Sequence, residues 1–457
     1  MNKPESAGMY ASAEKIYPRE IGGRFDKLSK LATTILLGLF YAAPWLLWDG
    51  RQAFLFDLPA RKFHLLGLTL WPQDFPYLAL LLIIAALSLF FFTALAGRLW
   101  CGFACPQTVW TEAFIWMEQF TEGTRSQRMK LDKAPWSITK FRKKASKQFL
   151  WITFSMWTGF TFVGYFTPVR ELGIDILELS VGGSTLFWGL FYGFATYGNA
   201  GYMREQVCKY MCPYARFQSA MFDKDTLIIS YDEKRGEPRG SRKRSVDPKE
   251  AGLGDCIDCQ LCVQVCPTGI DIREGLQYEC IACAACIDAC DSIMDKMNYP
   301  RGLVRYTTEH SLKNETTRVL RPRMFVYATL LLILVSGLVI AMTSRTPVIL
   351  DVIRDRNSLY REIADNFVEN IYTLKIINQS NDARSFVVTV SGLENVVLDG
   401  VDGEVRVDGG GVLSLPVRVR ARRDDAYGVN EILFSVVATD DSSVVMAEDS
   451  RFIGPMR

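Results

Sequence analysis

Long apolar blocks alternate with charged segments along this chain, a pattern typical of a membrane protein. Five blocks approach the roughly 20 residues that a helix needs to span a bilayer core. They cover residues 31–48, 77–97, 149–166, 185–203 and 324–342, and none contains lysine, arginine, aspartate or glutamate. We therefore expect a bundle of about five transmembrane helices. Glycines dilute the fourth block, and in a bundle they favour close helix packing.

The positive charges between these blocks predict how the chain crosses the membrane. Lysine and arginine number six in the first 30 residues, then three, ten, one and nineteen in the four segments that separate the blocks. Cytoplasmic segments carry the excess of positive charge. The alternation predicts a cytoplasmic N-terminus and a final tail on the outer side of the membrane.

The tail after the fifth block follows a different period. IYTLKIIN, RSFVVTVSG, VLSLPVRVRARR and NEILFSVVAT alternate with the two-residue period of half-buried strands. About 110 residues of short strands indicate an all-β, immunoglobulin-like sandwich over residues 347–457. This stretch contains neither cysteine nor tryptophan, so the predicted sandwich is not of the disulfide-bearing kind.

Composition adds an unusual ratio of twelve cysteines to two histidines. All twelve cysteines fall in residues 98–148 and 204–323, the two segments that the charge pattern places in the cytoplasm. Unpaired thiols belong in such a reducing compartment. Many thiols favour a thiolate-ligated metal, and haem is disfavoured because neither His64 nor His310 lies in an apolar block. The net charge of +2 disfavours nucleic acid as a partner.

Eight of the cysteines form a repeated motif. The spacing C-x-x-C-x-x-C-x-x-x-C occurs twice, 24 residues apart, and is the signature of a bacterial ferredoxin with two [4Fe–4S] clusters. In such folds the fourth cysteine of each motif ligates the other cluster. We therefore assign Cys256, Cys259, Cys262 and Cys290 to one cluster, and Cys280, Cys283, Cys286 and Cys266 to the second. Zinc knuckles are the alternative, but zinc sites rarely use four thiols at this spacing twice.

The other four cysteines form two pairs with identical spacing. Cys101 and Cys105 follow the second block, Cys208 and Cys212 follow the fourth, and each pair reads C-x-x-x-C-P. Residues four apart share one face of a helix, so each pair can present two thiolates if the spanning helix continues until the proline stops it. Four thiolates at one membrane surface would make a further metal centre, or a transfer site for a soft cation such as Cu(I). The plainer alternative is that they are small buried residues at helix ends.

These patterns predict a multi-domain membrane protein. It combines an α-helical transmembrane bundle of about five spans, a cytoplasmic bacterial-type 2[4Fe–4S] ferredoxin domain and a C-terminal immunoglobulin-like sandwich. The expected segments are a cytoplasmic N-terminal segment at 1–30, a four-span region with both C-x-x-x-C-P motifs at 31–223, a linker at 224–254, the ferredoxin domain at 255–300, a connector at 301–323, a fifth transmembrane helix at 324–342 and a periplasmic domain at 347–457.

Several longer motifs extend this picture. They include PWLLWDGRQAFLFDLPARKFH, WCGFACPQTVW, CKYMCPYARFQSAMFDKDTLIISYD, the repeated ferredoxin motif and NYPRGLVRY. Together they resemble the FixG/RdxA/CcoG family of cytochrome c oxidase accessory proteins, which are membrane-bound polyferredoxins. The resemblance runs over nearly the whole chain.

The resemblance implies a role in the biogenesis of a cbb(3)-type cytochrome c oxidase. It also implies reduction of Cu(II) to Cu(I) on the cytoplasmic side, with a copper-exporting P-type ATPase and oxidase assembly factors as partners. The clusters would supply single electrons, and the thiols of the two C-x-x-x-C-P pairs would bind the copper ion. The electron donor is unknown. Two alternatives stay open: a quinol-oxidising membrane ferredoxin, and a non-catalytic assembly scaffold whose clusters sense redox state.

Overall fold

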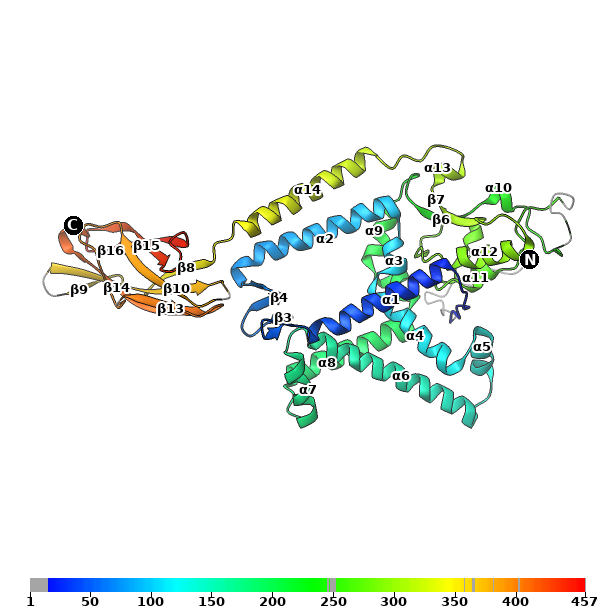
Figure 1. The fold of residues 1–457 in the computed structure, drawn as a ribbon, viewed down its shortest axis with the longest axis horizontal. Helices are drawn as coiled ribbons and strands as arrows, with labels where there is room; N and C mark the ends of the chain where they lie inside the picture. Colours follow the sequence, from blue (N-terminus) through cyan, green and yellow to red (C-terminus); the bar gives the residue numbers. More distant parts are fainter. Residues whose placement is uncertain are drawn as a thin grey trace. The chain divides into compact units, whose positions relative to one another are not determined.

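The computed structural model describes residues 15–244, 246, 252–356, 358–363, 366–380, 382–401 and 403–456. The chain divides into two compact units, Met1–Val335 and Ser336–Arg457. Figure 1 labels the helices and strands of both units. The start of the predicted N-terminal segment, 1–14, and part of the predicted linker, 245 and 247–251, lie outside the described residues.

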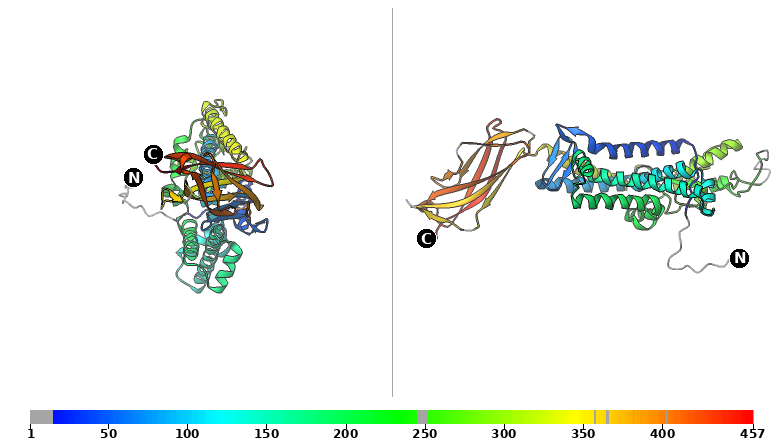
Figure 2. Two further views of the ribbon diagram at one scale, coloured as in Figure 1. Left: turned by 90° about the vertical axis from the view of Figure 1, so that its left-hand side faces the viewer. Right: turned by 90° about the horizontal axis from the view of Figure 1, so that it is seen from below.

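Helices dominate the first unit. Their bounds are α1 Arg24–Ala42, α2 Phe75–Ala96, α3 Leu99–Phe103, α4 Pro106–Glu122, α5 Arg125–Lys133, α6 Ile138–Val163, α7 Val169–Glu178, α8 Gly183–Thr196 and α9 Pro213–Met221. Two π-helical turns, η3 Tyr197–Met203 and η4 Val207–Met211, lie between α8 and α9. Contacts join α1 to α4, α4 to α6 and α6 to α8, and these helices run side by side in Figure 1 and in the right-hand view of Figure 2.

Glycines allow the closest of these helix contacts. A methyl group at Gly159 of α6 would overlap the backbone of Gly189 and would lie 2.9 Å from the amide nitrogen of Gly193, both on α8. Small residues let helix backbones approach in a membrane bundle. Close helix packing is therefore confirmed for Gly189 and Gly193 of the fourth apolar block.

Two helices in the described part of the chain are long and apolar enough to cross a membrane. One is Pro72–Ala96, which includes α2, and the other is α14, Pro322–Thr343. A third crossing would be the pair Val169–Glu178 and Gly183–Met203, which is bent by 100°. These helices correspond to the second, fifth and fourth predicted blocks. Crossings at the first and third blocks stay predictions.

The helices at the first and third blocks begin earlier than predicted. α1 starts with a polar turn that includes Asp26 and Lys27, and it ends at Ala42. Pro44 lies in the 3-10 turn that follows, because a proline interrupts the hydrogen bonding of a longer helix. The first half of α6 is basic and only its second half matches the apolar block.

Short antiparallel strands connect α1 to α2. They are β1 Leu47–Trp48, β2 Arg51–Gln52, β3 Phe54–Asp57, β4 Lys62–Leu65 and β5 Leu68–Leu70. Asp49 and Gly50 both have positive φ, 48° and 76°, as a two-residue type I′ hairpin turn requires. The predicted outer loop after the first block is therefore a compact pair of small sheets.

The ferredoxin region takes in more of the chain than predicted. Its elements are β6 Ile228–Tyr231, α10 Glu233–Gly236, α11 Leu261–Gln264, the 3-10 turn η5 Ile272–Glu274, α12 Ala285–Met297, β7 Val304–Thr307 and α13 Glu309–Leu312. β6 pairs antiparallel with β7, and Ile229 and Val304 are buried in one core with Cys256 and Cys262. The segments predicted as linker and connector thus supply strands that shield the cysteine core from water.

The second unit is a sandwich of two antiparallel sheets. One sheet has the order β12-β14-β10-β8 with β9 beside β10, and the other has the order β13-β11-β15-β16. The strands are β8 Val348–Arg354, β9 Arg361–Ile363, β10 Phe367–Asn378, β11 Arg384–Ser391, β12 Val397–Asp399, β13 Glu404–Val407, β14 Val412–Arg422, β15 Val429–Ala438 and β16 Val445–Ile453. Tyr372, Phe386 and Phe434 are buried in its core. The predicted all-β domain is confirmed.

Candidate metal centres

The first group of ferredoxin cysteines surrounds a small cavity. Cys256, Cys259, Cys262 and Cys290 line it together with apolar side chains such as Leu261, Leu303 and Val304. Three of these thiols come from α11 and the loop before it, and the fourth comes from α12. The apolar walls would shield a metal group held by the thiols from water. These are the four cysteines that the motif spacing assigned to one cluster.

The second group surrounds a separate cavity of the same kind. Cys266, Cys280, Cys283 and Cys286 line it, with Ile270 and Ile272 among its apolar walls. Cys262 borders this cavity as well as the first one. The two cavities are therefore neighbours, so metal groups bound in them would lie close enough to exchange electrons.

The two cysteine loops have the same unusual backbone. Asp258 and Gln260 have φ of 54° and 55°, and Ala282 and Ala284 have φ of 55° and 62°. These are equivalent positions of the two motifs. Left-handed backbone costs a residue other than glycine roughly 1–2 kcal/mol. The same strain recurs because each loop must turn three cysteines toward one cavity.

The spacing of the sulfurs bears on the kind of metal group. Within the described residues, no three cysteine, histidine, aspartate or glutamate side chains come together closely enough to hold one metal ion. Four sulfurs on one zinc ion must lie within about 4 Å of one another, because each Zn–S bond is about 2.3 Å. A [4Fe–4S] cluster keeps its cysteines further apart, since iron and sulfide fill the centre. The two cavities therefore fit clusters better than zinc knuckles.

The two C-x-x-x-C-P pairs lie in breaks between helices. Cys101 is in the short helix α3, which follows α2, and Cys208 is in the π-helical turn η4, which follows α8 and η3. Cys105 and Cys212 are the N-cap residues of α4 and α9. The spanning helices therefore do not continue straight through the pairs, and that expectation is wrong. The thiols are presented by turns and helix starts.

Both prolines of these motifs begin a helix, although the sequence analysis expected them to end one. Pro106 is the first residue of α4 and Pro213 is the first residue of α9. Proline suits this position because the first amide of a helix has no partner within the helix. Cys105 and Cys212, which precede them, lie at the positive ends of helix dipoles. Burial nevertheless raises the pKa of the Cys105 thiol.

The four thiols of the pairs lie near one another. Burial, followed by the charges of Cys105, Cys101 and Cys212, raises the pKa of the Cys208 thiol to about 12. Burial likewise raises the pKa of the Cys101 thiol to about 11. A bound cation would lower these thiol pKa values, because it stabilises the thiolate form directly. Sulfur donors suit a soft metal, but within the described residues no three of these thiols come close enough together to hold one ion in this arrangement.

Helix α3 packs directly against the loop of the second ferredoxin motif. A methyl group at Gly102 would lie 2.8 Å from the carbonyl oxygens of both Ile281 and Ala282. These two residues separate Cys280 from Cys283. Only a glycine permits this approach. The backbone beside the first C-x-x-x-C-P pair therefore touches the backbone beside the second cluster cavity.

We expect Gly102→Ala to loosen this contact. The new methyl group meets backbone that cannot move aside cheaply, so the variant should lose about 1–3 kcal/mol of stability. Gly38→Ala is the matched control, because nothing lies within 4 Å of a methyl group at that position of α1. Thermal unfolding followed by circular dichroism in detergent compares the two. Equal unfolding temperatures would contradict the packing described here.

Polar contacts reinforce this junction. The Arg98 guanidinium, at the start of α3, donates to the backbone carbonyl of Tyr278. Lys209 of η4 donates to the carbonyl oxygen of Thr268 at 3.0 Å, and the Thr268 hydroxyl lies 3.3 Å from the sulfur of Cys266. Both C-x-x-x-C-P pairs are thus anchored to the ferredoxin loops around the second cavity.

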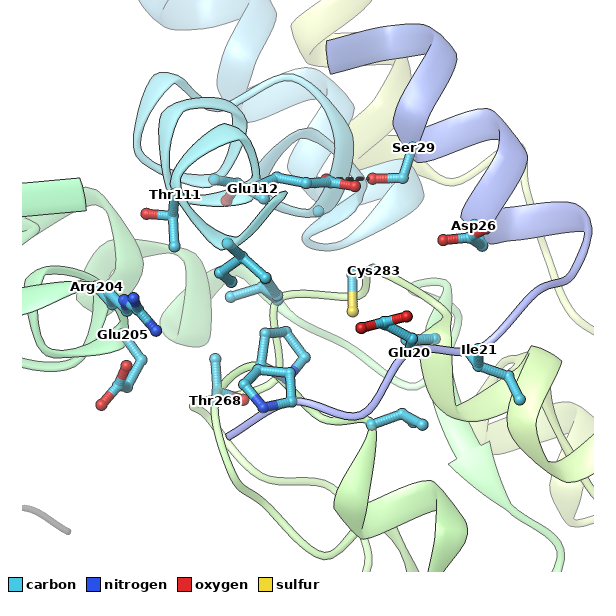
Figure 3. A pocket seen from close by; sticks show the side chains of 18 of the residues that line it. Glu20, Ile21, Asp26, Ser29, Thr111, Glu112, Arg204, Glu205, Thr268 and Cys283 are labelled. Atoms are coloured by element: carbon cyan, nitrogen blue, oxygen red, sulfur yellow. Dashed lines mark hydrogen bonds between the residues drawn. The ribbon is translucent and has the colours of Figure 1, made fainter. Parts of the chain in front are cut away.

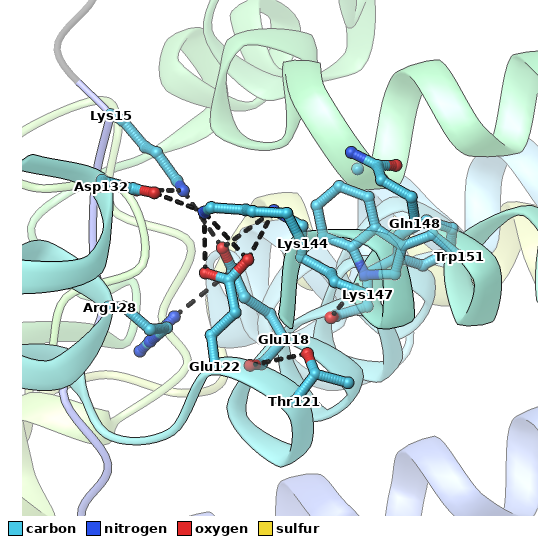
Figure 4. A network of polar contacts seen from close by, with 12 residues as sticks. Lys15, Glu118, Thr121, Glu122, Arg128, Asp132, Lys144, Lys147, Gln148 and Trp151 are labelled. Carbon is cyan, nitrogen blue, oxygen red and sulfur yellow. Dashed lines mark hydrogen bonds and ion pairs between the residues drawn. The ribbon is translucent and has the colours of Figure 1, made fainter. Parts of the chain in front are cut away.

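A buried network of charges surrounds Glu118 and Glu122 of α4 (Figure 4). Glu118 of α4 is fully buried, and Arg204 donates to its carboxylate at 2.8 Å. Arg128, Lys15 and Lys147 pair with the same carboxylate at 3.4, 3.1 and 3.9 Å. Nothing in the sequence analysis indicated this network, because its members come from separate segments with no shared motif.

Comparison with known proteins places the chain among curated relatives. It is 39% identical over 408 residues to protein RdxB of Cereibacter sphaeroides, covering 86% of this chain and 85% of that protein. It is 36% identical over 483 residues to nitrogen fixation protein FixG of Rhizobium meliloti, covering 95% and 91%. Protein RdxA of Cereibacter sphaeroides is 38% identical over 430 residues, with 91% and 89% covered. A crystal structure of a FixG-related protein from Vibrio parahaemolyticus matches 24% of this chain and 98% of that chain, with 33% identity and a TM-score of 0.22.

Three family models match successive parts of the chain. A 4Fe–4S binding domain matches residues 78–122, which contain the first C-x-x-x-C-P pair. A 4Fe–4S dicluster domain matches residues 203–309, which contain the second pair and all eight ferredoxin cysteines. The Ig-like fold at the C-terminus of FixG matches residues 338–455. The chain is an iron–sulfur electron-transfer protein, and it belongs to the FixG/RdxA family.

Proposed function

We propose that this protein reduces Cu(II) to Cu(I) at the four thiols of its C-x-x-x-C-P pairs. Single electrons would come from two [4Fe–4S] clusters. Cys256, Cys259, Cys262 and Cys290 would hold one cluster, and Cys266, Cys280, Cys283 and Cys286 the other. When bound, the clusters supply one-electron redox chemistry. The chain's own residues bring the two cavities and the four thiols together.

The contact at Gly102 is the observation that carries this proposal. It joins the turn that holds the first thiol pair to the loop between Cys280 and Cys283. An electron on the second cluster would therefore have only a short stretch of backbone to cross before it reached the thiols. Without such a contact, nothing in the fold would link the two cysteine sites for electron transfer.

The thiols themselves favour the reduced ion. Sulfur ligands bind Cu(I) more strongly than oxygen and nitrogen ligands do, so they stabilise the product of the reaction. Each turnover is Cu²⁺ + e⁻ → Cu⁺. This step is electron transfer alone and needs no acid or base catalyst. A protein with both clusters reduced would make two Cu(I) ions.

The predicted membrane topology indicates where in the cell the reaction would take place. We place the clusters and thiol pairs on the cytoplasmic side of a bacterial inner membrane and the immunoglobulin-like domain on the periplasmic side. Cu(I) made there would pass to a copper-exporting P-type ATPase and serve assembly of a cbb(3)-type oxidase. Support comes from the positive charge between the apolar blocks and from the confinement of all twelve cysteines to two segments.

A stoichiometric assay tests the proposed reaction. The full chain is purified anaerobically in detergent, reduced with dithionite, freed of reductant and mixed with Cu(II) and a Cu(I)-specific chelator. We expect about two Cu(I) per protein, one for each [4Fe–4S] cluster, as the cluster absorbance of the oxidised state returns. No Cu(I) from protein with both clusters reduced would exclude the reaction.

A further inference from the structure

A large cavity lies beside the second group of ferredoxin cysteines (Figure 3). Its walls come from the N-terminal segment, α1, α4, the turn before η4 and the ferredoxin loops. Cys283 lines this cavity and also lines the second cluster cavity, and Ile281 and Ala285 do the same. A molecule in the large cavity would therefore be separated from the second cluster by one layer of side chains, which permits direct electron transfer.

The lining combines apolar surface with one well-placed carboxylate. Phe25, Ile115 and Trp116 contribute apolar and aromatic faces. Glu112 accepts a hydrogen bond from the Ser29 hydroxyl at 2.7 Å. Burial raises the pKa of Glu112, although this hydrogen bond opposes the effect. Apolar walls with a few convergent polar groups are typical of a small-molecule site, and a carboxyl group with a raised pKa is a better proton acceptor near neutral pH.

The charges around the cavity disfavour a phosphorylated electron donor. Its carboxylates are Glu20, Asp26, Glu112 and Glu205, and its cations are Arg19, Lys30 and Arg204. Two of the three cations are already paired, Lys30 with Asp26 at 2.7 Å and Arg204 with Glu118 at 2.8 Å. The phosphates of a nicotinamide or flavin nucleotide would find little attraction there. A neutral donor that releases protons suits this lining better.

Helix α1 places the cavity close to apolar surface. Ser29 lines the cavity from one face of the helix, and Leu31, Ile35 and Leu39, which are 56%, 51% and 63% exposed, follow on the opposite face. An exposed apolar stripe on a membrane protein marks contact with lipid. The cavity and the lipid-facing stripe are therefore separated by the width of one helix.

The geometry points to a binding site for a membrane hydroquinone, which would be the electron donor of the reductase. This inference rests on the proposed function, since the electrons are passed to the clusters. The hydroquinone is oxidised to the quinone, and its two O–H bonds break. Its two electrons would pass one to each cluster held by the eight ferredoxin cysteines, one proton would go to the Glu112 carboxylate, and the other would go to water. The proton on Glu112 would then leave to solvent.

The reverse reaction tests this site without interference from direct reaction of hydroquinone with Cu(II). The full chain in lipid nanodiscs is reduced with dithionite, freed of reductant and mixed anaerobically with decylubiquinone. Recovery of the visible cluster absorbance then reports oxidation by the quinone. Thr111→Trp fills the cavity and Glu112→Gln removes the proton carrier, and each should slow this oxidation about tenfold or more. Thr111 and Glu112 both line the cavity.

Two controls separate the cavity from the clusters. Glu309→Gln makes the same change at an exposed glutamate of α13, outside the cavity lining, and should leave the rate unchanged. Oxidation by ferricyanide should be the same in all variants, at equal iron content, whereas oxidation by Cu(II) is no control because Cys208 also lines the cavity. Wild-type rates with decylubiquinone in both Thr111→Trp and Glu112→Gln would overturn the inference.

The two proposals fail in different ways. If reduced protein makes Cu(I) but decylubiquinone does not oxidise its clusters, the hydroquinone site is wrong and the cupric reductase stands. If decylubiquinone oxidises the clusters quickly in wild type and slowly in the cavity variants, the hydroquinone site is supported even where no Cu(I) forms. In that last case the proposed copper reaction is the one excluded.

Discussion

Replacing Cys101, Cys105, Cys208 and Cys212 together with serine is expected to lower Cu(I) formation at least about 100-fold. Serine offers a neutral oxygen, which binds Cu(I) poorly. Loss of a residue that only supports a ligand already costs about 10–100-fold in metal affinity, so loss of the ligands themselves should cost more. The measurement is the anaerobic chelator assay, with dithionite-reduced protein and equal iron content in both samples.

The iron content of this variant separates two explanations. If the pairs handle copper, the serine variant keeps the iron of two [4Fe–4S] clusters and its reduced spectrum is unchanged. Since family models for 4Fe–4S domains match both pairs, loss of one further cluster's iron would instead show that the pairs hold a cluster of their own. Wild-type Cu(I) formation by the serine variant would remove the pairs from the reaction.

Glu118→Ala is expected to be the most destabilising single change in the first unit. The carboxylate is fully buried and pairs with Arg204 and Arg128, so its removal leaves buried guanidinium groups without their counter-charge. Breaking a buried ion pair in this way costs about 3–5 kcal/mol. Glu309→Ala, which breaks the exposed pair with Lys313 on α13, is the matched control and should change the unfolding temperature little.

The same network predicts a dependence on pH. Burial would raise the pKa of Glu118, but Arg204 and Lys15 outweigh it and lower the pKa from 4.5 to about 2. A carboxyl group with a lowered pKa in the folded state stabilises the protein above its unfolded pKa. The stability difference between wild type and Glu118→Ala should therefore be constant above about pH 5 and shrink as the pH falls from 4.5 toward 2. A difference that grows on acidification would contradict this account of the network.

Local patterns in the sequence were sufficient for the elements that depend on local chemistry. α2 and α14 are apolar on all sides, so a hydropathy pattern finds them without knowledge of their neighbours. The ferredoxin cysteines are close in sequence because three thiols of one loop must face one cavity. The strands of the second unit alternate with a two-residue period because each has one buried face.

Features that depend on contacts between distant segments could not be predicted in this way. The motif C-x-x-x-C-P is compatible with a helix that ends at the proline and with a helix that begins there, and only packing against the ferredoxin loops distinguishes them. β6 and β7 are four residues each and far apart in the sequence, so neither has a pattern that separates it from a linker. The carboxylates of the large cavity likewise belong to no motif.

X-ray absorption at the copper edge tests the central claim most directly. The reduced protein is given one equivalent of Cu(II) without chelator, frozen, and compared with the four-serine variant at equal iron content. We expect Cu(I) with sulfur ligands in the wild type and loss of that sulfur coordination in the variant. Cu(I) bound by oxygen and nitrogen alone, or identical sulfur coordination in both proteins, would contradict it.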